Sequence, residues 1–184
     1  MQKHPEAGIK RSLFAPFFVA FALGVWTPTV LAHGDLNDAS SIGADDWVTW
    51  GEVVHGGFGS HIALGIRIGQ DALKRLGAQR RDVEVTVTEG AGSPCACVAD
   101  GITLATAASA GQRSLIVAPK SSDESYMLLI EVRKKKSERS VSYRVPVSAM
   151  APLGNMNIGK SPRQRFELVM AAAETTLYTV TEKK

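Results

Sequence analysis

Four side chains in this sequence could bind a soft metal ion, and they fall in two short blocks. The first block, residues 55–61, reads His-Gly-Gly-Phe-Gly-Ser-His and contains His55 and His61. The second block is a Cys-Ala-Cys sequence that holds both cysteines of the chain, Cys95 and Cys97. Imidazole and thiolate are ligands that suit zinc or copper, and such sites need three or four groups around one ion. These four residues are therefore our candidate metal ligands.

Each of these residues also has a simpler interpretation. His55 can lie in a loop and His61 on the surface of a helix, without any ligand between them. Because Cys95 and Cys97 are separated by one residue, they can form a metal chelate, an inert disulfide or a redox pair. The pair has neither the strict spacing of a zinc finger nor the Cys-x-x-Cys pattern of common redox motifs. The residues by themselves leave these alternatives open.

A carboxylate follows the second cysteine by three residues. Asp100 would lie in the first turn of a helix that begins at about Val98, where its charge is favourable near the positive end of the helix dipole. A carboxylate in this position can also orient a metal-binding imidazole from behind. We expect Asp100 to support the site in this second role.

Two helices are expected to position these groups. Over residues 60–76 apolar side chains recur at helical spacing, with Ser60 as the candidate N-cap and a glycine directly after the last turn. Gly65 and Gly69 lie one turn apart on one face, so a strand or a second copy of the chain, as in a homodimer, should approach that face closely. The second helix is expected over residues 98–110, directly after the cysteines.

The rest of the chain predicts an α+β fold with a mixed or antiparallel sheet that is packed by helices. Residues 83–88 alternate apolar and polar side chains, which is typical of a half-buried strand. A charged hairpin tip lies at residues 134–139, and a C-terminal helix is expected over residues 163–173. Further strands are expected over residues 114–118, 126–133, 141–147 and 175–180. The core therefore has the order helix, strand, helix, three strands.

The order of these motifs resembles the FmdE family, which takes its name from a component of formylmethanofuran dehydrogenase. In that family a loop of the form HGHxCPG enters a helix that reads roughly LALGxRxG, and a later C-x-V-D-A/G segment leads into a helix ending in GKxNL. Here residues 61–69 match the first helix, residues 97–101 match the second motif, and residues 111–115 match a degraded GKxNL. The resemblance covers about residues 50–120, and it implies the same order of helices and strands.

The chain departs from the family pattern in the loop and in the last motif. His55 keeps the opening histidine, but Gly57 stands in place of the second histidine and Gly59 in place of the loop cysteine. The Thr, Lys and Asn of the last motif are replaced by Ser109, Gln112 and Ser114. These changes remove a thiolate, a charge and an amide from the place where the resemblance puts the site.

The resemblance therefore implies a metal site only at His55, Cys97 and Asp100, with His61 and Cys95 as local substitutes. The family's activity, a part of carbon dioxide reduction onto methanofuran, is not carried over to this chain. Zinc or copper is the expected metal, and no catalytic residue is assigned.

The N-terminus predicts export. Three basic residues precede an apolar run over residues 13–25, and a Val-Leu-Ala sequence ends at Ala32, which is typical of a secretory signal peptide over residues 1–32. An uncleaved membrane anchor is the alternative. Residues 33–45 are rich in polar and small side chains and would form a flexible leader, and residues 46–184 a single domain. We expect a periplasmic or secreted protein without stable membrane association after cleavage.

The exported part of the chain carries almost no net charge. The whole chain has 21 basic and 18 acidic residues, and the signal peptide holds three of the basic residues and one of the acidic ones. A chain this close to neutral lacks the excess of positive charge that is typical of nucleic-acid-binding domains. We therefore expect a metal ion or a small molecule as the ligand.

Three functions are open at this point. The leading hypothesis is an exported FmdE-like binding protein that holds a transition metal, or a small anionic ligand, between the His55–His61 loop and the Cys95–Asp100 turn. The second is an enzyme or accessory subunit that uses Cys97 with His55 or His61. The third is a partner-binding scaffold that keeps the fold without a metal, and the replacements in the loop and in the last motif favour the third over the second.

Overall fold

The fold is described from a computed structural model, in which residues 41–184 are placed. The predicted signal peptide, over residues 1–32, and most of the predicted leader lie outside the described residues. The first helix, α1 (Ala44–His55), begins just inside the segment that was expected to be leader. Its residue Trp47 is 1% exposed, so α1 already belongs to the packed domain.

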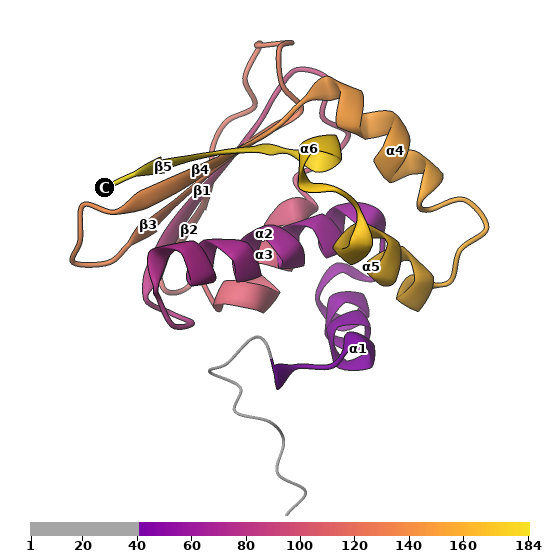
Figure 1. Ribbon diagram of the computed structural model, residues 1–184, viewed down its shortest axis with the longest axis horizontal. Helices are drawn as coiled ribbons and strands as arrows, with labels where there is room; N and C mark the ends of the chain where they lie inside the picture. The colour runs from indigo at the N-terminus through magenta and orange to yellow at the C-terminus, as the bar shows by residue number, and fades with distance from the viewer. Residues whose placement is uncertain (1–40) are drawn as a thin grey trace, which may run out of the picture. The chain divides into compact units, whose positions relative to one another are not determined.

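The remaining elements confirm an α+β fold that ends in helices and a last strand (Figure 1). In chain order they are α2 (Ser60–Leu76), β1 (Val83–Glu89), α3 (Val98–Thr106), β2 (Leu115–Val117), β3 (Leu128–Lys134), β4 (Ser140–Val145), a 3-10 turn (Val147–Ala149), α4 (Met150–Asn155), α5 (Pro162–Ala171), α6 (Glu174–Leu177) and β5 (Thr179–Lys183).

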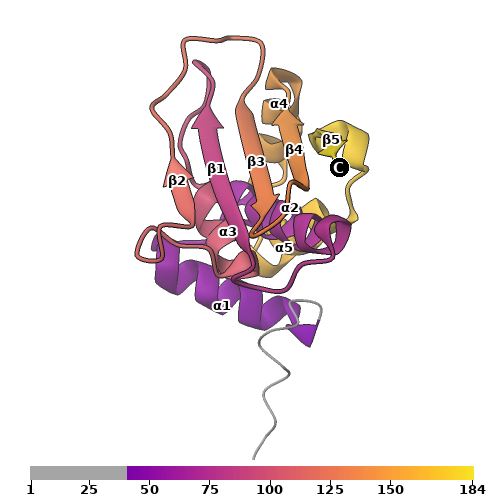
Figure 2. The ribbon, with the colours of Figure 1, turned by 90° about the vertical axis from the view of Figure 1, so that its left-hand side faces the viewer.

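The described strands form one mixed sheet with the order β2-β1-β3-β4-β5 (Figure 2). The connection from β1 to β2 passes through α3, and these two strands are parallel, as a helical crossover requires. The other neighbours are antiparallel, and β3 and β4 form the predicted hairpin. The last strand was expected over residues 175–180, but α6 occupies the start of that range and β5 follows it.

The core lies between the sheet and the helices, which are on one side of it (Figure 1). On β1 the residues Val83, Val85 and Val87 are at most 2% exposed, while the residues between them are half-buried on the other face. This alternation is the predicted strand pattern. The apolar side chains of α2 are buried along most of its length, so α2 is the central helix of the domain.

The close approach predicted at the glycines of α2 is present, but its partner is α3 and not a strand or a second copy of the chain. A Cβ atom built on Gly65 would lie 2.1 Å from the backbone oxygen of Val98, and one built on Gly101 would lie 2.1 Å from the backbone oxygen of Ile62. A Cβ on Gly69 would lie 2.6 Å from the Cβ of Ala105. Glycine on both helices therefore lets the two backbones touch, which fixes the start of α3 against the start of α2.

Two helix ends differ from the prediction. Ser60 is the first residue of α2 and not its N-cap, which is Gly59; the Ser60 hydroxyl instead donates to the backbone oxygen of Leu153 at 2.8 Å. Helix α3 ends at Thr106 and not near residue 110, because Ala107 takes a left-handed conformation with φ 56°. The side-chain pattern alone therefore did not predict either end.

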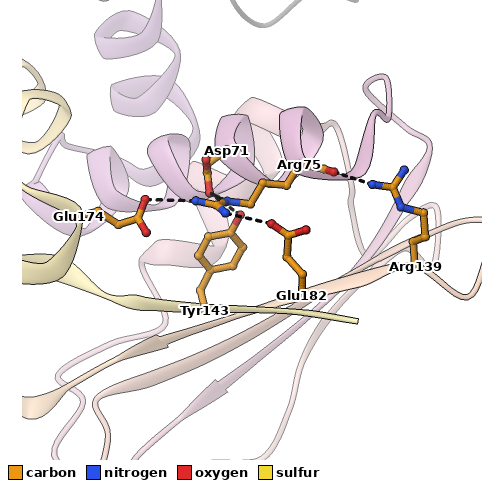
Figure 3. A network of polar contacts seen from close by, with 6 residues as sticks. All are labelled: Asp71, Arg75, Arg139, Tyr143, Glu174 and Glu182. Atoms are coloured by element: carbon orange, nitrogen blue, oxygen red, sulfur yellow. Dashed lines mark hydrogen bonds and ion pairs between the residues drawn. The ribbon is translucent and has the colours of Figure 1, made fainter. Parts of the chain in front are cut away.

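The C-terminal segment is held on α2 by a network of ion pairs around Arg75 (Figure 3). The guanidinium contacts Asp71 at 2.6 Å, Glu182 at 3.0 Å and Glu174 at 3.3 Å. The buried Tyr143 hydroxyl donates to the same Asp71 carboxylate at 2.8 Å, and burial together with this hydrogen bond raises the pKa of Tyr143. The network joins α2 to β4, α6 and β5.

Two cations from the β3–β4 hairpin cap the C-terminus of α2. Arg139 donates to the backbone oxygens of Leu76, at 2.9 Å, and Arg75, at 2.8 Å. Lys134 donates to the backbone oxygen of Gly77 at 2.7 Å. Positive charges are favourable at this end of a helix, so these cations stabilise the end of α2 opposite to the candidate site.

Candidate functional site

The N-terminus of α3 brings the two predicted blocks together. His55 is the last residue of α1, and its Nδ1 lies 2.7 Å from Oδ2 of Asp100, which is 45 residues away in the sequence. The two side chains are 32% and 40% exposed, so solvent reaches the pair. With a carboxylate as acceptor, Nδ1 donates the hydrogen bond and Nε2 of the neutral ring keeps a free lone pair.

The end of α1 explains how His55 reaches this position. Gly56 follows it with φ 83°, a left-handed conformation that favours glycine, and its N–H donates to the backbone oxygen of Glu52. The chain then turns through the glycine-rich loop, and Arg165 of α5 holds this loop by donating to the backbone oxygen of Phe58 at 2.8 Å. The loop is therefore anchored at both ends.

The two cysteines form a disulfide with each other directly before α3. Cys97 is the residue that precedes the helix, and both cysteines are half-buried. Ser93 donates from its hydroxyl to the backbone oxygen of Cys95 at 3.1 Å, and Lys120 donates to the backbone oxygen of Ser93 at 2.7 Å. Of the alternatives for this pair, the structure forms the bridge, so neither sulfur is a free thiolate.

One cysteine of the disulfide, Cys97, comes shortly before Asp100 in the helical part of the chain. Cys97 has helical backbone angles, φ −55° and ψ −24°, and Asp100 follows it by three residues. Side chains three residues apart on a helix are neighbours on its surface. A sulfur and a carboxylate are therefore neighbours at the start of α3, and the carboxylate accepts the hydrogen bond from the imidazole of His55.

His61 is in a different environment from His55. It sits in the first turn of α2, where it is half-buried, and its Nε2 is buried without a hydrogen-bond partner among the described residues. Burial lowers the pKa of His61, which keeps the ring neutral. Within residues 41–184 no group of three or more His, Cys, Asp or Glu side chains is placed to hold a metal ion.

The donor atoms at the start of α3 match zinc or copper only in the reduced state of the chain. In the disulfide form, the imidazole of His55 is the free donor of the predicted set at this position, and a single imidazole does not make a site. Reduction would add two thiolates, which are the softer ligands that these metals prefer. The redox state of the cysteines thus decides what this region can bind.

The degraded third motif, residues 109–115, lies at the other end of α3, and its polar groups hydrogen-bond to one another and to the nearby backbone. The Ser109 N–H donates to Oγ of Ser114 at 3.1 Å, and the Gln112 N–H donates to Oγ of Ser109 at 3.3 Å. The Gln112 side chain donates to the backbone oxygen of Ala107 at 3.2 Å. These polar residues close the turn after α3 and do not extend the His55–Asp100 region.

The sequence did not predict the hydrogen bond from Lys120 to the backbone oxygen of Ser93. The two residues are 27 positions apart, and Lys120 follows a strand in a polar stretch that carries no motif. A lysine that donates to a backbone oxygen leaves no pattern in a sequence, so only the tertiary structure could reveal it.

Comparison with known proteins agrees with this architecture. The family model described as FmdE, Molybdenum formylmethanofuran dehydrogenase operon, matches residues 54–183. No curated protein matches the chain. Within the described residues, no helix is long and apolar enough to cross a membrane. Because the family match covers well over half of the chain and includes the α1 end, the disulfide and the whole sheet, this chain belongs to the FmdE family.

Proposed function

We propose that this protein is an exported FmdE-type domain that binds zinc or copper at the start of α3 once Cys95 and Cys97 are reduced. The observation that carries the proposal is the hydrogen bond between His55 Nδ1 and Asp100 Oδ2 at 2.7 Å. Metal-binding histidines commonly donate their second ring N–H to a carboxylate, which fixes the tautomer and orients the ring. His55 has this arrangement, and its Nε2 would be the ligand.

The two thiolates would complete a set of three protein ligands. Cys97 is on the same helix face as Asp100, and Cys95 precedes it by two residues. Three protein ligands leave one position of a tetrahedral zinc site for water or a small anionic ligand. His61 is not needed for this set, and its buried Nε2 would have to become exposed before it could join.

Metal content as a function of redox state tests the proposal. We expect the reduced protein, kept under anaerobic conditions, to bind one zinc ion per chain in competition with a chromophoric chelator, and the oxidised protein to bind none. Cys97→Ser should abolish binding. Asp100→Asn should weaken it by roughly 10- to 100-fold, the usual effect of losing a carboxylate behind a metal ligand. His61→Gln is the matched control and should bind as the wild type does.

Two outcomes would contradict this function. If the reduced wild-type protein holds neither zinc nor copper in stoichiometric amount, the partner-binding scaffold becomes the better hypothesis. If His61→Gln loses the metal while Asp100→Asn retains it, the ligand set includes the first turn of α2 and the role given to the His55–Asp100 pair is wrong.

A further inference from the structure

The Cys95–Cys97 bond does not act as a structural cross-link. The two residues are two positions apart in one turn, so the bond joins no element to another. A disulfide stabilises a fold mainly by closing a loop of the unfolded chain, and the gain falls as the loop shortens. A bridge around a single residue contributes little in this way. Its position therefore suggests a chemical role.

The surroundings of the bond are partly exposed and are held in place. Both cysteines are half-buried, Cys97 against the hydrophobic core, and Pro94 before them is exposed. The backbone on the N-terminal side is fixed by the Ser93 hydroxyl on the oxygen of Cys95 and by Lys120 on the oxygen of Ser93. These contacts do not involve the sulfur atoms, so they can persist when the S–S bond opens.

The two sulfur atoms differ in their electrostatic environment. Cys97 is the N-cap of the nine-residue helix α3, and its side chain makes no capping hydrogen bond. The Ala99 N–H of the first turn is engaged by the backbone oxygen of Ala96, so it is the helix dipole that favours a thiolate here over a thiol. Asp100 in the first turn opposes this effect, but its carboxylate is engaged by His55. Cys97 packs against the hydrophobic core and Cys95 lies outside the helix, so we take Cys95 as the sulfur that is attacked and Cys97 as the leaving group.

We propose that the Cys95–Cys97 bond is a thiol–disulfide exchange site whose substrate is a dithiol. A thiolate of the substrate attacks Sγ of Cys95, a mixed disulfide forms there, and the electron pair of the S–S bond leaves with Cys97 as a thiolate. The second thiolate of the substrate then attacks the substrate sulfur of the mixed disulfide. Cys95 leaves as a thiolate and takes up a proton from water. The protein gains two electrons as a dithiol, and the substrate becomes a disulfide. No metal takes part in the exchange, although it uses the same two cysteines as the proposed metal site.

Reduction of the folded protein tests the exchange step. The oxidised protein is treated with dithiothreitol at pH 7 in the presence of a chelator and without denaturant, and free thiols are trapped with iodoacetamide at increasing times. We expect the bond to be reduced while the circular dichroism of the protein stays unchanged. At early times, peptide mass spectrometry should find dithiothreitol attached to Cys95 and the alkylated thiol at Cys97. A bond that opens only after unfolding, or an early adduct on Cys97, would overturn the proposal.

A pair of single variants tests the asymmetry of the sulfur atoms. In Cys95→Ser the remaining thiol is Cys97, and in Cys97→Ser it is Cys95. We expect the Cys97 thiol to be alkylated about fivefold faster at pH 7, because a thiolate at a helix N-terminus is more populated. Equal or reversed rates would contradict the assignment. Peptide mapping of the reduced wild type provides the same comparison if either variant fails to fold, and the chelator keeps the result independent of metal binding.

Discussion

The two histidines of the first block differ because of their surroundings and not because of their sequence. His55 is partly exposed and donates to a carboxylate, so its ring is oriented and its second nitrogen is available. His61 is half-buried, and its Nε2 has no hydrogen-bond partner in the part of the chain that the structure describes. The first environment suits a ligand of a metal ion. The second costs stability whenever the ring takes up a proton.

We expect His61 to make the protein less stable at mildly acidic pH. Burial lowers the pKa of His61 in the folded state below its ordinary value of 6.5. As pH falls through 6.5 the unfolded chain binds a proton that the folded chain does not, so the free energy of unfolding is highest above that pH and decreases below it. Urea unfolding at pH 7.5 and pH 5.5 measures this loss.

The variant His61→Gln should lose less stability between these two pH values than the wild type, since it has no imidazole to protonate. His55→Gln is the control. It still contains His61, so it should still lose the stability that protonation of His61 in the unfolded chain accounts for. Parallel pH dependence in the wild type and in His61→Gln would show that His61 does not bind an extra proton on unfolding.

At the scale of elements, the contact between α2 and α3 sets the geometry of the candidate site. Gly65 meets the backbone of Val98, and Val98 directly follows Cys97. In the same contact Gly101 of α3, which directly follows Asp100, meets the backbone of Ile62 on α2. The residues that could do chemistry are thus neighbours of the residues at which the two backbones touch.

Replacing Gly65 by Ala should therefore affect both stability and the site. The new Cβ would lie 2.1 Å from a backbone oxygen, which cannot move as a side-chain end can, and we expect a loss of about 1–3 kcal/mol in the free energy of unfolding. The metal affinity of the reduced protein should fall as well, because α3 must shift. Urea denaturation measures the first effect and chelator competition the second.

Gly154→Ala is the matched control for this change. Gly154 is a helical glycine, and apart from its chain neighbours and its own helix backbone no atom of the described residues lies within 4 Å of an added Cβ, so the variant should be as stable as the wild type or slightly more stable. If Gly65→Ala unfolds at the same urea concentration as the wild type, the two helices are not in backbone contact.

At the scale of the whole molecule, α2 connects the candidate site with the C-terminus. Its first turns contact α3, and Arg75 near its end holds Glu174 and Glu182 (Figure 3). The family match extends to residue 183, so it includes β5. The C-terminal strand is therefore a part of the domain and not an appendage.

Export is the prediction that concerns the molecule as a whole. We expect the mature protein to begin at His33 and to be recovered from the periplasm, because the first 32 residues have the pattern of a signal peptide. Cell fractionation followed by N-terminal sequencing measures this. An intact Met1 in a membrane fraction would instead show an uncleaved anchor.

The sequence by itself determined the elements whose pattern is local. The helix over residues 60–76 and the strand over residues 83–88 were predicted at nearly their observed bounds, because the period of buried side chains follows directly from the backbone geometry. The sequence also predicted the family, because the family's motifs are short and occur in the expected order. Both blocks of the candidate site were found in this way.

The tertiary structure decided which of these residues meet. The His55–Asp100 bond spans 45 positions, and no local pattern encodes such a pair. Only the packing of α2 made α3 the partner of Gly65 and left His61 buried without a hydrogen bond from Nε2 to any described residue. The sequence allowed a chelate, a bridge or a redox pair for the cysteines, and the turn before α3 brought the two sulfur atoms within bonding distance. Burial and contact depend on how distant segments pack, so they became known only from the folded chain.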